Sequence, residues 1–252
     1  MEQLWLTRVL NALLGPAVVR VGETLGARFE NPAAPIPNHV AYILFVTVFL
    51  VVFFWWLRRK LSMDRPGGMQ HLVESVVGGI QGLSDAIIGP QGRKHLSFHV
   101  SLGTFIFFAN LVGLVPGFES PTSNINVTAG CAIVVFCYYN WVGIRQHGLL
   151  GYLKEFMGPV PLIAPLMVPV EILSHLARPF SLSVRLFANI YGEDLIILVF
   201  AGLLPFVLPL PILALAIFTS LLQAFVFVIL SIVYISQTVA HDDGHGEEAH
   251  AR

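Results

Sequence analysis

Long apolar runs separated by short polar or proline-rich breaks dominate the hydrophobic pattern of this chain. The clearest run extends over residues 40–57, and further runs follow at 96–115 and 125–144. Each is close to the roughly 20 residues that a helix needs to cross the ~30 Å hydrocarbon core of a bilayer. The pattern therefore predicts three membrane-spanning helices in this part of the chain.

A different pattern lies between the first two runs, at residues 69–92. Its apolar residues fall on one stripe of a helix, whereas Gln70, Glu74, Gln81 and Asp85 fall elsewhere. A helix with one apolar stripe and this much polarity is typical of a segment on the membrane surface or against another subunit. We therefore expect a surface amphipathic helix here.

Two longer helices are predicted in the C-terminal part. Closely spaced prolines (Pro159, Pro161, Pro165 and Pro169) disfavour a regular helix before about residue 170. The first long helix is expected over 170–204, where roughly 35 residues correspond to about 52 Å. The second is expected over 212–239. Because both exceed the ~30 Å apolar core, we expect a strongly tilted hairpin.

Composition supports a membrane protein. The chain has 252 residues, of which 56% are hydrophobic and 12% charged, and its mean hydropathy is +0.76. A soluble domain carries about 25% charged residues. We therefore expect an all-α polytopic membrane protein with about five spans, forming a single membrane domain over 1–252. Residues 1–39 are expected to form an external N-terminal segment and residues 240–252 a cytoplasmic tail.

The distribution of basic residues predicts the orientation. They cluster between the first two runs, at Arg58, Arg59, Lys60, Arg65, Arg93 and Lys94, and recur at Arg145 and Lys154. Because basic loops stay on the cytoplasmic side, five spans place the N-terminus outside and the C-terminus in the cytoplasm. No segment resembles a transit peptide, so the expected location is a bacterial cytoplasmic (inner) membrane.

The segment 170–204 carries charges at a depth where they are costly. They are Glu171, His175, Arg178, Arg185, Glu193 and Asp194. A charge at the bilayer centre costs at least ~2.5 kcal/mol, so it normally faces a protein partner or a water-filled path. The segment therefore marks the functional part of the chain.

The spacing of polar residues sharpens this interpretation. At about 100° per residue, one stripe lies within about 40° of Arg185. Its members are Glu171, Ser174, Arg178, Ser181, Asn189 and Gly192. On the last helix Gln223 shares a face with Thr219, Tyr234 and Gln237. A pair of polar helix faces with one deep arginine indicates ion movement.

Structural roles remain open for several of these residues. Glu171 and Arg178 lie near enough to the helix start to reach the cytoplasmic interface. Ser181 can bond back to its own helix, and Gln223 can join two helices by hydrogen bonds. Arg185 lies about 15 residues from the predicted helix start, or about 22 Å along the axis. This is too deep for its side chain to reach the cytoplasmic interface.

The second span raises similar questions. His95 and His99 near its start are expected at the interface. Asn110 in its middle either joins helices or lines a channel, and the sequence leaves both roles open.

Three segments resemble one known family. The run Ser181–Asp194, with the sequence SLSVRLFANIYGED, resembles the arginine motif of F-type ATP synthase subunit a. The segment Leu222–Phe227 (LQAFVF) and Tyr234 resemble the last helix of that family, and Pro121–Thr128 (PTSNINVT) resembles the start of its third span. The resemblance covers about residues 40–240.

The resemblance implies five spans, a surface helix and two long tilted helices packed against a rotating ring of c subunits. Protons are expected to cross through two offset half-channels at that interface, coupling the proton-motive force to ATP synthesis. Implied partners are the c-subunit ring, the b-subunit peripheral stalk, other ATP synthase subunits and the lipid bilayer, but no nucleic acid. We expect no cofactor, no metal and no enzyme activity in this chain alone, because nucleotide chemistry belongs to its partners.

The resemblance also assigns roles to residues. Arg185 matches the essential arginine of the family, Glu171 an acidic residue on the cytoplasmic side, and Asp194, beside Glu193, the carboxylate of the outer half-channel. The expected proton path comprises Glu171, Ser181, Asn189, Glu193, Asp194 and Gln223. One position departs from the pattern, because Ala216 stands where some members carry a histidine that partners the outer carboxylate.

The main alternative is an independent ion-coupled secondary transporter. Such proteins usually contain inverted repeats and broken helices that bind substrate, and this chain shows no internal repeat. An intramembrane enzyme is disfavoured because the sequence contains no His-Glu-x-x-His motif and no P-loop.

Overall fold

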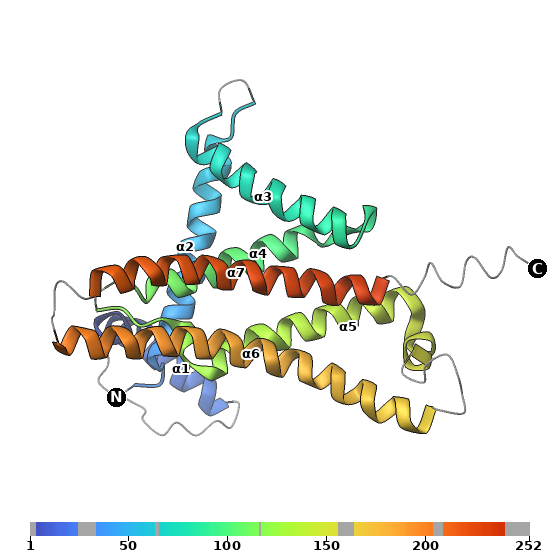
Figure 1. Cartoon of the computed structure of the whole chain (residues 1–252). Coiled ribbons are helices and arrows are strands. Elements are labelled where there is room, and N and C mark those ends of the chain that lie inside the picture. Colours follow the sequence, from blue (N-terminus) through green and yellow to red (C-terminus); the bar gives the residue numbers. More distant parts are fainter. Residues whose placement is uncertain are drawn as a thin grey trace, which may run out of the picture. The chain divides into compact units, whose positions relative to one another are not determined.

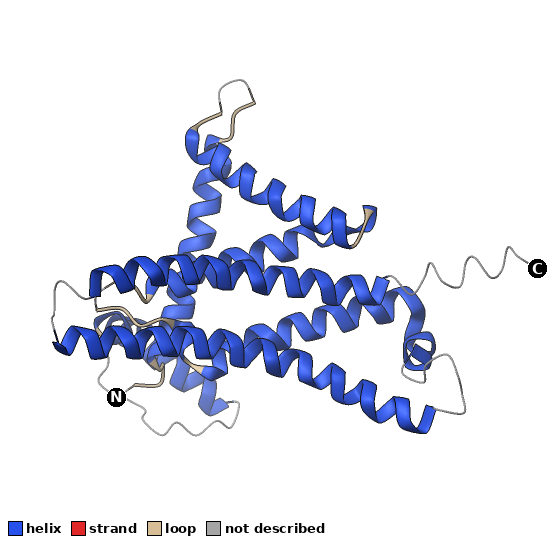
Figure 2. Ribbon diagram, viewed as in Figure 1, coloured by secondary structure: helices blue, strands red, loops and turns tan. Residues whose placement is uncertain are grey.

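Helices account for all the regular secondary structure in the described part of the chain (Figure 1, Figure 2). The computed structural model describes residues 4–24, 34–63, 66–115, 117–155, 164–203 and 209–239. The elements are α1 (Trp5–Thr24), α2 (Asn38–Lys60), α3 (Gly68–Ile87), the 3₁₀ helix η1 (Pro90–His95), α4 (Leu96–Val112), the 3₁₀ helix η2 (Pro121–Ser123), α5 (Ile125–Glu155), α6 (Ala164–Leu203) and α7 (Pro209–Val239). The predicted all-α class is confirmed.

Four helices in the described ranges are long and apolar enough to cross a membrane. They are Asn38–Lys60, Pro90–Val112, Ile125–Leu149 and Leu210–Val239. A polytopic membrane protein is therefore confirmed. The fifth predicted span, which falls on α6, stays a prediction. The 40 residues of α6 correspond to about 60 Å, roughly twice the thickness of the hydrocarbon core.

The chain forms two compact units. The first comprises Met1–Leu61, Phe105–Val127 and Phe187–Leu221, and the second comprises Ser62–Thr104, Thr128–Leu186 and Leu222–Arg252. Helices α4 to α7 each contribute residues to both units. The predicted tail at 240–252 and part of the predicted N-terminal segment at 1–39 lie outside the described residues.

In the first unit a polar turn is tied to the end of α4. Ser120 donates a hydrogen bond to the carbonyl of Ala109 (3.2 Å), and Thr122 donates one to Oδ1 of Asn110 (2.6 Å). A Cβ added at Gly113 would lie 2.5 Å from Cβ of Ser120, so turn and helix are in close contact. The structure therefore favours the linking role for Asn110, which is 2% exposed.

In the second unit α3 runs back alongside η1 and the start of α4 (Figure 1). The Ser84 hydroxyl donates to the carbonyl of Gly92 at 3.2 Å, and a Cβ at Gly92 would lie 2.7 Å from Ser84 oxygen atoms. Helices α4 and α7 approach closely at Gly103, where a Cβ would lie 2.6 Å from Cγ2 of Val228. Glycines thus allow both contacts.

Both long helices begin earlier than predicted. α6 begins at Ala164 rather than near residue 170, and α7 at Pro209 rather than 212. Pro165 and Pro209 lie in first turns, where the missing N–H would have no partner within the helix. Pro169 and Pro179 lie inside α6, so each removes one helical hydrogen bond without ending the helix.

Two glycines set boundaries that the hydrophobic pattern did not reveal. The third predicted span ended at 144, but α5 continues to Glu155 and bends at Gly148, whose φ is 69°. The surface helix predicted over 69–92 ends at Ile87, and Gly89, with φ 84°, precedes η1. Positive φ is accessible to glycine at little cost, so the chain changes direction at both positions.

The interfacial position expected for His95 and His99 stays a prediction, but both side chains are buried by other parts of the chain. Their side chains belong to the interior of the second unit, with exposures of 8% and 0%. Nδ1 of His95 lies 2.9 Å from the Tyr138 hydroxyl, and the ring of Phe98 stacks on that of Tyr138 at 3.8 Å. Because these partners come from α5, the spacing within one helix could not reveal them.

Candidate functional site

Two sides of α6 differ in exposure around the deep arginine. Leu182, Leu186 and Ile190 are buried, with exposures of 1%, 0% and 3%. Arg185 and Asn189 are exposed. The apolar residues, four positions apart, share one side of the helix, and the arginine lies on another. The arginine therefore lies on an exposed surface of α6.

The same exposed face of α6 is built largely from small side chains. Its exposed members include Ser174, Ala177, Ser181, Val184 and Ala188. Small residues let a neighbouring helix approach closely within a membrane. Of the predicted site residues, Ser181, Arg185 and Asn189 share this exposed face.

Arg185 has no carboxylate partner among the described residues. The ion pairs in those ranges join Arg93 to Asp85 at 3.6 Å and His175 to Glu171 at 3.4 Å. A structural ion pair within the described chain therefore does not account for Arg185. If α6 spans the membrane as predicted, Arg185 needs a partner or water, because an uncompensated arginine at bilayer depth costs at least ~2.5 kcal/mol.

Glu193 and Asp194 are half-buried in the first unit. The Glu193 carboxylate accepts a hydrogen bond from the Thr219 hydroxyl of α7. Asp194 interacts electrostatically with Glu119, which precedes η2 in the turn between α4 and α5. Three carboxylates are thus gathered in this unit, and one of them, Glu119, was not predicted from the sequence.

Gln223, the α7 residue of the predicted proton path, is turned toward the protein, as are Ala216 and Thr219 on the same helix. Ala216 and Gln223 are 1% and 4% exposed, and Thr219 is half-buried between them. Thr219 Oγ1 also lies 3.1 Å from the Ala216 carbonyl. Ala216 therefore neighbours the threonine that binds Glu193.

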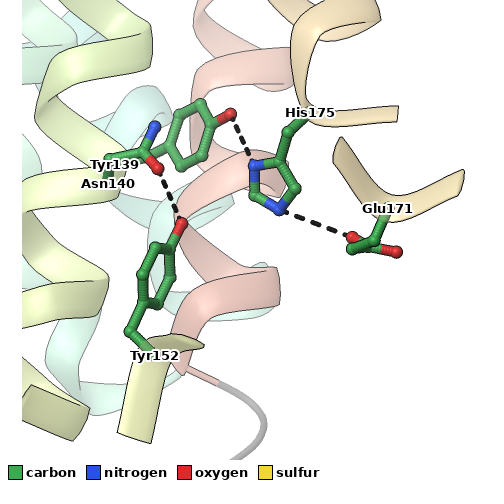
Figure 3. A network of polar contacts seen from close by, with 5 residues as sticks. All are labelled: Tyr139, Asn140, Tyr152, Glu171 and His175. Atoms are coloured by element: carbon green, nitrogen blue, oxygen red, sulfur yellow. Dashed lines mark hydrogen bonds and ion pairs between the residues drawn. The ribbon is translucent and has the colours of Figure 1, made fainter. Parts of the chain in front are cut away.

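A second polar cluster joins α5 and α6 within the second unit (Figure 3). The Tyr139 hydroxyl lies 3.2 Å from Nδ1 of His175, whose Nε2 lies 3.4 Å from the Glu171 carboxylate. Beside them, the Tyr152 hydroxyl donates to Oδ1 of Asn140 at 2.7 Å. The line of groups runs from a part-exposed carboxylate to a buried hydroxyl.

Arg178 lies against two tyrosine rings. Its guanidinium carbon is 5.9 Å from the ring centroid of Tyr139 and 5.6 Å from that of Tyr234. A cation over an aromatic face contributes ~0.5–2 kcal/mol. Tyr234 interacts electrostatically with both Arg178 and Arg185, so the aromatic contacts extend toward the deep arginine.

Sequence reasoning left His175, Tyr139 and Glu119 without a role. The spacing of four between Glu171 and His175 was a visible signal, because such residues are neighbours on a helix. Tyr139 and Glu119 approach α6 from other parts of the chain, and no pattern within one helix could identify them. The described residues contain no group of three or more His, Cys, Asp or Glu side chains suited to a metal ion.

Comparison with known proteins identifies similar chains. Residues 40–236 match the family model described as ATP synthase A chain. The ATP synthase subunit a of Solibacter usitatus is 46% identical over 210 residues, covering 83% of this chain and 90% of the relative. That of Koribacter versatilis is 41% identical over 244 residues, covering 97% and 99%. That of a Sulfurovum species is 48% identical over 191 residues, covering 75% and 79%.

Proposed function

Because this chain belongs to the ATP synthase subunit a family, it is a component of the membrane sector of that complex, and we propose that it conducts protons across the membrane. The protons pass through two offset half-channels where α6 faces the rotating ring of c subunits. The observation that carries this proposal is the exposed Arg185, which lies on a different side of α6 from the buried apolar residues. A ring of acidic subunits supplies the compensating charge, for which the described residues of this chain offer no carboxylate partner.

Arg185 has two roles in this proposal. Its permanent positive charge favours the ionised form of a passing ring carboxylate by Coulomb attraction. The same charge repels protons and so separates the two half-channels. Without that barrier protons would cross without turning the ring. Moving one charge down 100 mV yields about 2.3 kcal/mol, so several protons are needed for each ATP.

The outer half-channel is proposed to run beside Glu193, Asp194 and Gln223. The hydrogen bond from Thr219 to Glu193 supports this path because it fixes the carboxylate against α7. Glu193 then fulfils the function that a histidine at the position of Ala216 has in some family members. The electrostatic interaction of Asp194 with Glu119 extends the acidic region toward the turn before η2.

The cytoplasmic half-channel is proposed to leave the ring interface along Ser181 and Glu171. Ser181 is exposed on the arginine-bearing face, and the Glu171 side chain is 42% exposed. Asn189, one turn from Arg185 on the same face, lies on the outer side of the barrier. Together these residues connect the interface to water on either side.

The remaining assignments follow from this role. The subunit is not an enzyme by itself, and it needs the c-subunit ring, the b-subunit stalk and the nucleotide-binding subunits. We place it in the inner membrane of a bacterium, with its N-terminus outside and its C-terminus in the cytoplasm. The basic residues Arg58, Arg59 and Lys60 at the end of α2 support this orientation.

Replacing Arg185 by alanine tests the proposal. ATP-driven proton pumping is measured in inverted membrane vesicles that contain equal amounts of assembled complex. We expect Arg185→Ala to abolish pumping, because the ring carboxylate loses its charge partner. Arg93→Ala is the matched control, since Arg93 pairs with Asp85 at an exposed site, and it should pump within about twofold of wild type. Normal pumping by Arg185→Ala would contradict the proposal.

A further inference from the structure

His175 is the residue whose surroundings the proposed function leaves unexplained. Its imidazole bridges two groups, with Nδ1 3.2 Å from the Tyr139 hydroxyl and Nε2 3.4 Å from the Glu171 carboxylate (Figure 3). The side chains of His175 and Glu171 are 13% and 42% exposed, whereas Tyr139 is 1% exposed. The three groups therefore form a continuous polar line from near solvent into the interior of the second unit.

Aromatic neighbours hold the imidazole in this position. The Tyr139 ring centroid lies 5.9 Å from that of His175, and the Tyr152 ring meets the imidazole edge-on at 6.5 Å. Tyr152 is itself fixed by its hydrogen bond to Asn140 and by its packing on Gly143, where a Cβ would lie 2.6 Å from the ring. The ring is thus oriented before any proton arrives.

The charges around the imidazole oppose one another. The titratable groups that face it are Glu171 and Arg178 on α6, Tyr139 and Tyr152 on α5, and Tyr234 on α7 through the Arg178 side chain. Burial opposes a positive charge on the ring, Arg178 opposes it as well, and Glu171 favours it. The imidazole is therefore neutral at rest, and its contacts with a hydroxyl on one nitrogen and a carboxylate on the other give it a proton donor and a proton acceptor.

The line continues toward the arginine. The rings of Tyr139 and Tyr234 lie 5.9 Å apart, and Arg178 lies against both. Tyr234 in turn interacts electrostatically with Arg185. All these residues belong to the second unit, so one connected set of polar and aromatic groups links the surroundings of Arg185 to Glu171.

We propose that His175 carries protons in the cytoplasmic half-channel, between the Tyr139 hydroxyl and the Glu171 carboxylate. This inference rests on the proposed function and adds a residue to its exit path. A proton released near Arg185 reaches the Tyr139 oxygen, whose own proton moves to Nδ1 of His175. The imidazolium gives its Nε2 proton to Glu171, which releases it to water. One proton moves, and each group then has its starting charge. The neutral imidazole is left protonated on Nδ1, and it returns to its first tautomer by losing that proton and gaining one at Nε2, with no net change in charge.

A purely structural histidine would behave differently. Glutamine or another polar group of similar size can keep a hydrogen bond to Tyr139 or Glu171, but it does not take up a proton near neutral pH. The two roles are therefore separated by chemical rescue, in which a small molecule fills the space left by the side chain. Imidazole can carry a proton there, whereas pyrazole has the same size and shape but is a far weaker base.

The experiment uses the intact complex in inverted vesicles, whose cytoplasmic face is open to added compounds. ATP-driven charge movement is followed as membrane potential, because a permeant base dissipates a pH gradient but not a potential. We expect His175→Ala to lower the initial rate by about tenfold or more. Imidazole should restore most of the rate, and pyrazole should not. Equal rescue by both compounds, no rescue by imidazole, or a wild-type rate without rescue would overturn the inference.

Two further variants keep the test decisive. If His175→Ala does not assemble, His175→Gln replaces it and should also be slowed about tenfold, with a wild-type rate counting against the inference. His147→Gln is the matched control, because Nε2 of His147 lies 2.9 Å from a backbone carbonyl, that of Thr238. It should leave the rate unchanged.

Arg185→Ala in the same vesicles distinguishes a failure of the proposed proton-conducting function from a failure of the role proposed for His175. If the proposed function fails, Arg185→Ala still generates a membrane potential. If only the present inference fails, Arg185→Ala is inactive while His175→Gln works at the wild-type rate.

Discussion

The charged residues of α6 differ in whether other described residues hold them by hydrogen bonds or ion pairs. Glu193 accepts a hydrogen bond from Thr219, and His175 is held between Glu171 and Tyr139. Arg185 has no carboxylate partner in the described ranges. Glu193 and His175 are thus held in position before a proton arrives, as proton-transfer groups need to be. Arg185, which lacks a carboxylate partner in the described ranges, fits the proposed role of a charge that meets a moving carboxylate.

Removing the Glu193 carboxylate should slow proton passage through the outer half-channel. We expect Glu193→Ala to lower ATP-driven pumping by at least about tenfold, because this half-channel loses a proton-transfer group. Thr219→Val should cost less, about fivefold, which corresponds to one hydrogen bond of ~1 kcal/mol. Glu74→Ala, at an exposed carboxylate of α3, serves as the control. If Glu193→Ala pumps at the wild-type rate, the outer path does not use this residue.

At the scale of helices, glycines decide how closely the spans approach. Gly103 on α4 faces Val228 on α7, and a Cβ there would lie only 2.6 Å from the valine Cγ2. Val228 is buried and branched at Cβ, so it has little freedom to move away. By contrast, a Cβ at Gly130 of α5 would meet no atom within 4 Å.

These two glycines should therefore respond differently to alanine. Gly103→Ala is expected to lower stability by about 1–3 kcal/mol, because the helices must separate to admit the methyl group. Gly130→Ala should be neutral or stabilising by up to ~1 kcal/mol, because alanine is the better helix former. Thermal unfolding of the purified complex measures both. Equal stability of the two variants would show that α4 and α7 do not touch at Gly103.

The hydrophobic and polar pattern of the sequence predicted which residues share a face of α6. It did not predict where α6 begins or which residues of different helices touch. Spacing along a single helix was enough to place Ser181, Arg185 and Asn189 on one face. The start of α6 was missed because Pro165 and Pro169 are tolerated near a helix start, although each removes an N–H donor. The contacts of Glu193 with Thr219, and of His175 with Tyr139, join different helices, and hydrophobic periodicity carries no information about such pairs.

At the scale of the whole molecule, the isolated chain exposes more apolar surface than a soluble protein would. Exposed large side chains on α7 include Leu215 (59%), Phe218 (56%), Leu221 (55%), Leu222 (43%) and Phe225 (47%). Lipid covers such residues at no cost, so they need no further explanation in a membrane protein. An exposed Arg185 does need one, because lipid cannot compensate its charge.

If the arginine-bearing face of α6 lies against the ring, a cysteine on it should cross-link to c subunits. Cys131 and Cys137 are first replaced by serine, since both are free. Asn189→Cys, on the exposed face, is then compared with Ile190→Cys, whose position is 3% exposed. In the assembled complex, with a cysteine on the outer surface of the c subunit, position 189 should form a disulfide and position 190 should not. A cross-link from 190 alone, or none from 189, would contradict the assignment of this face to the ring.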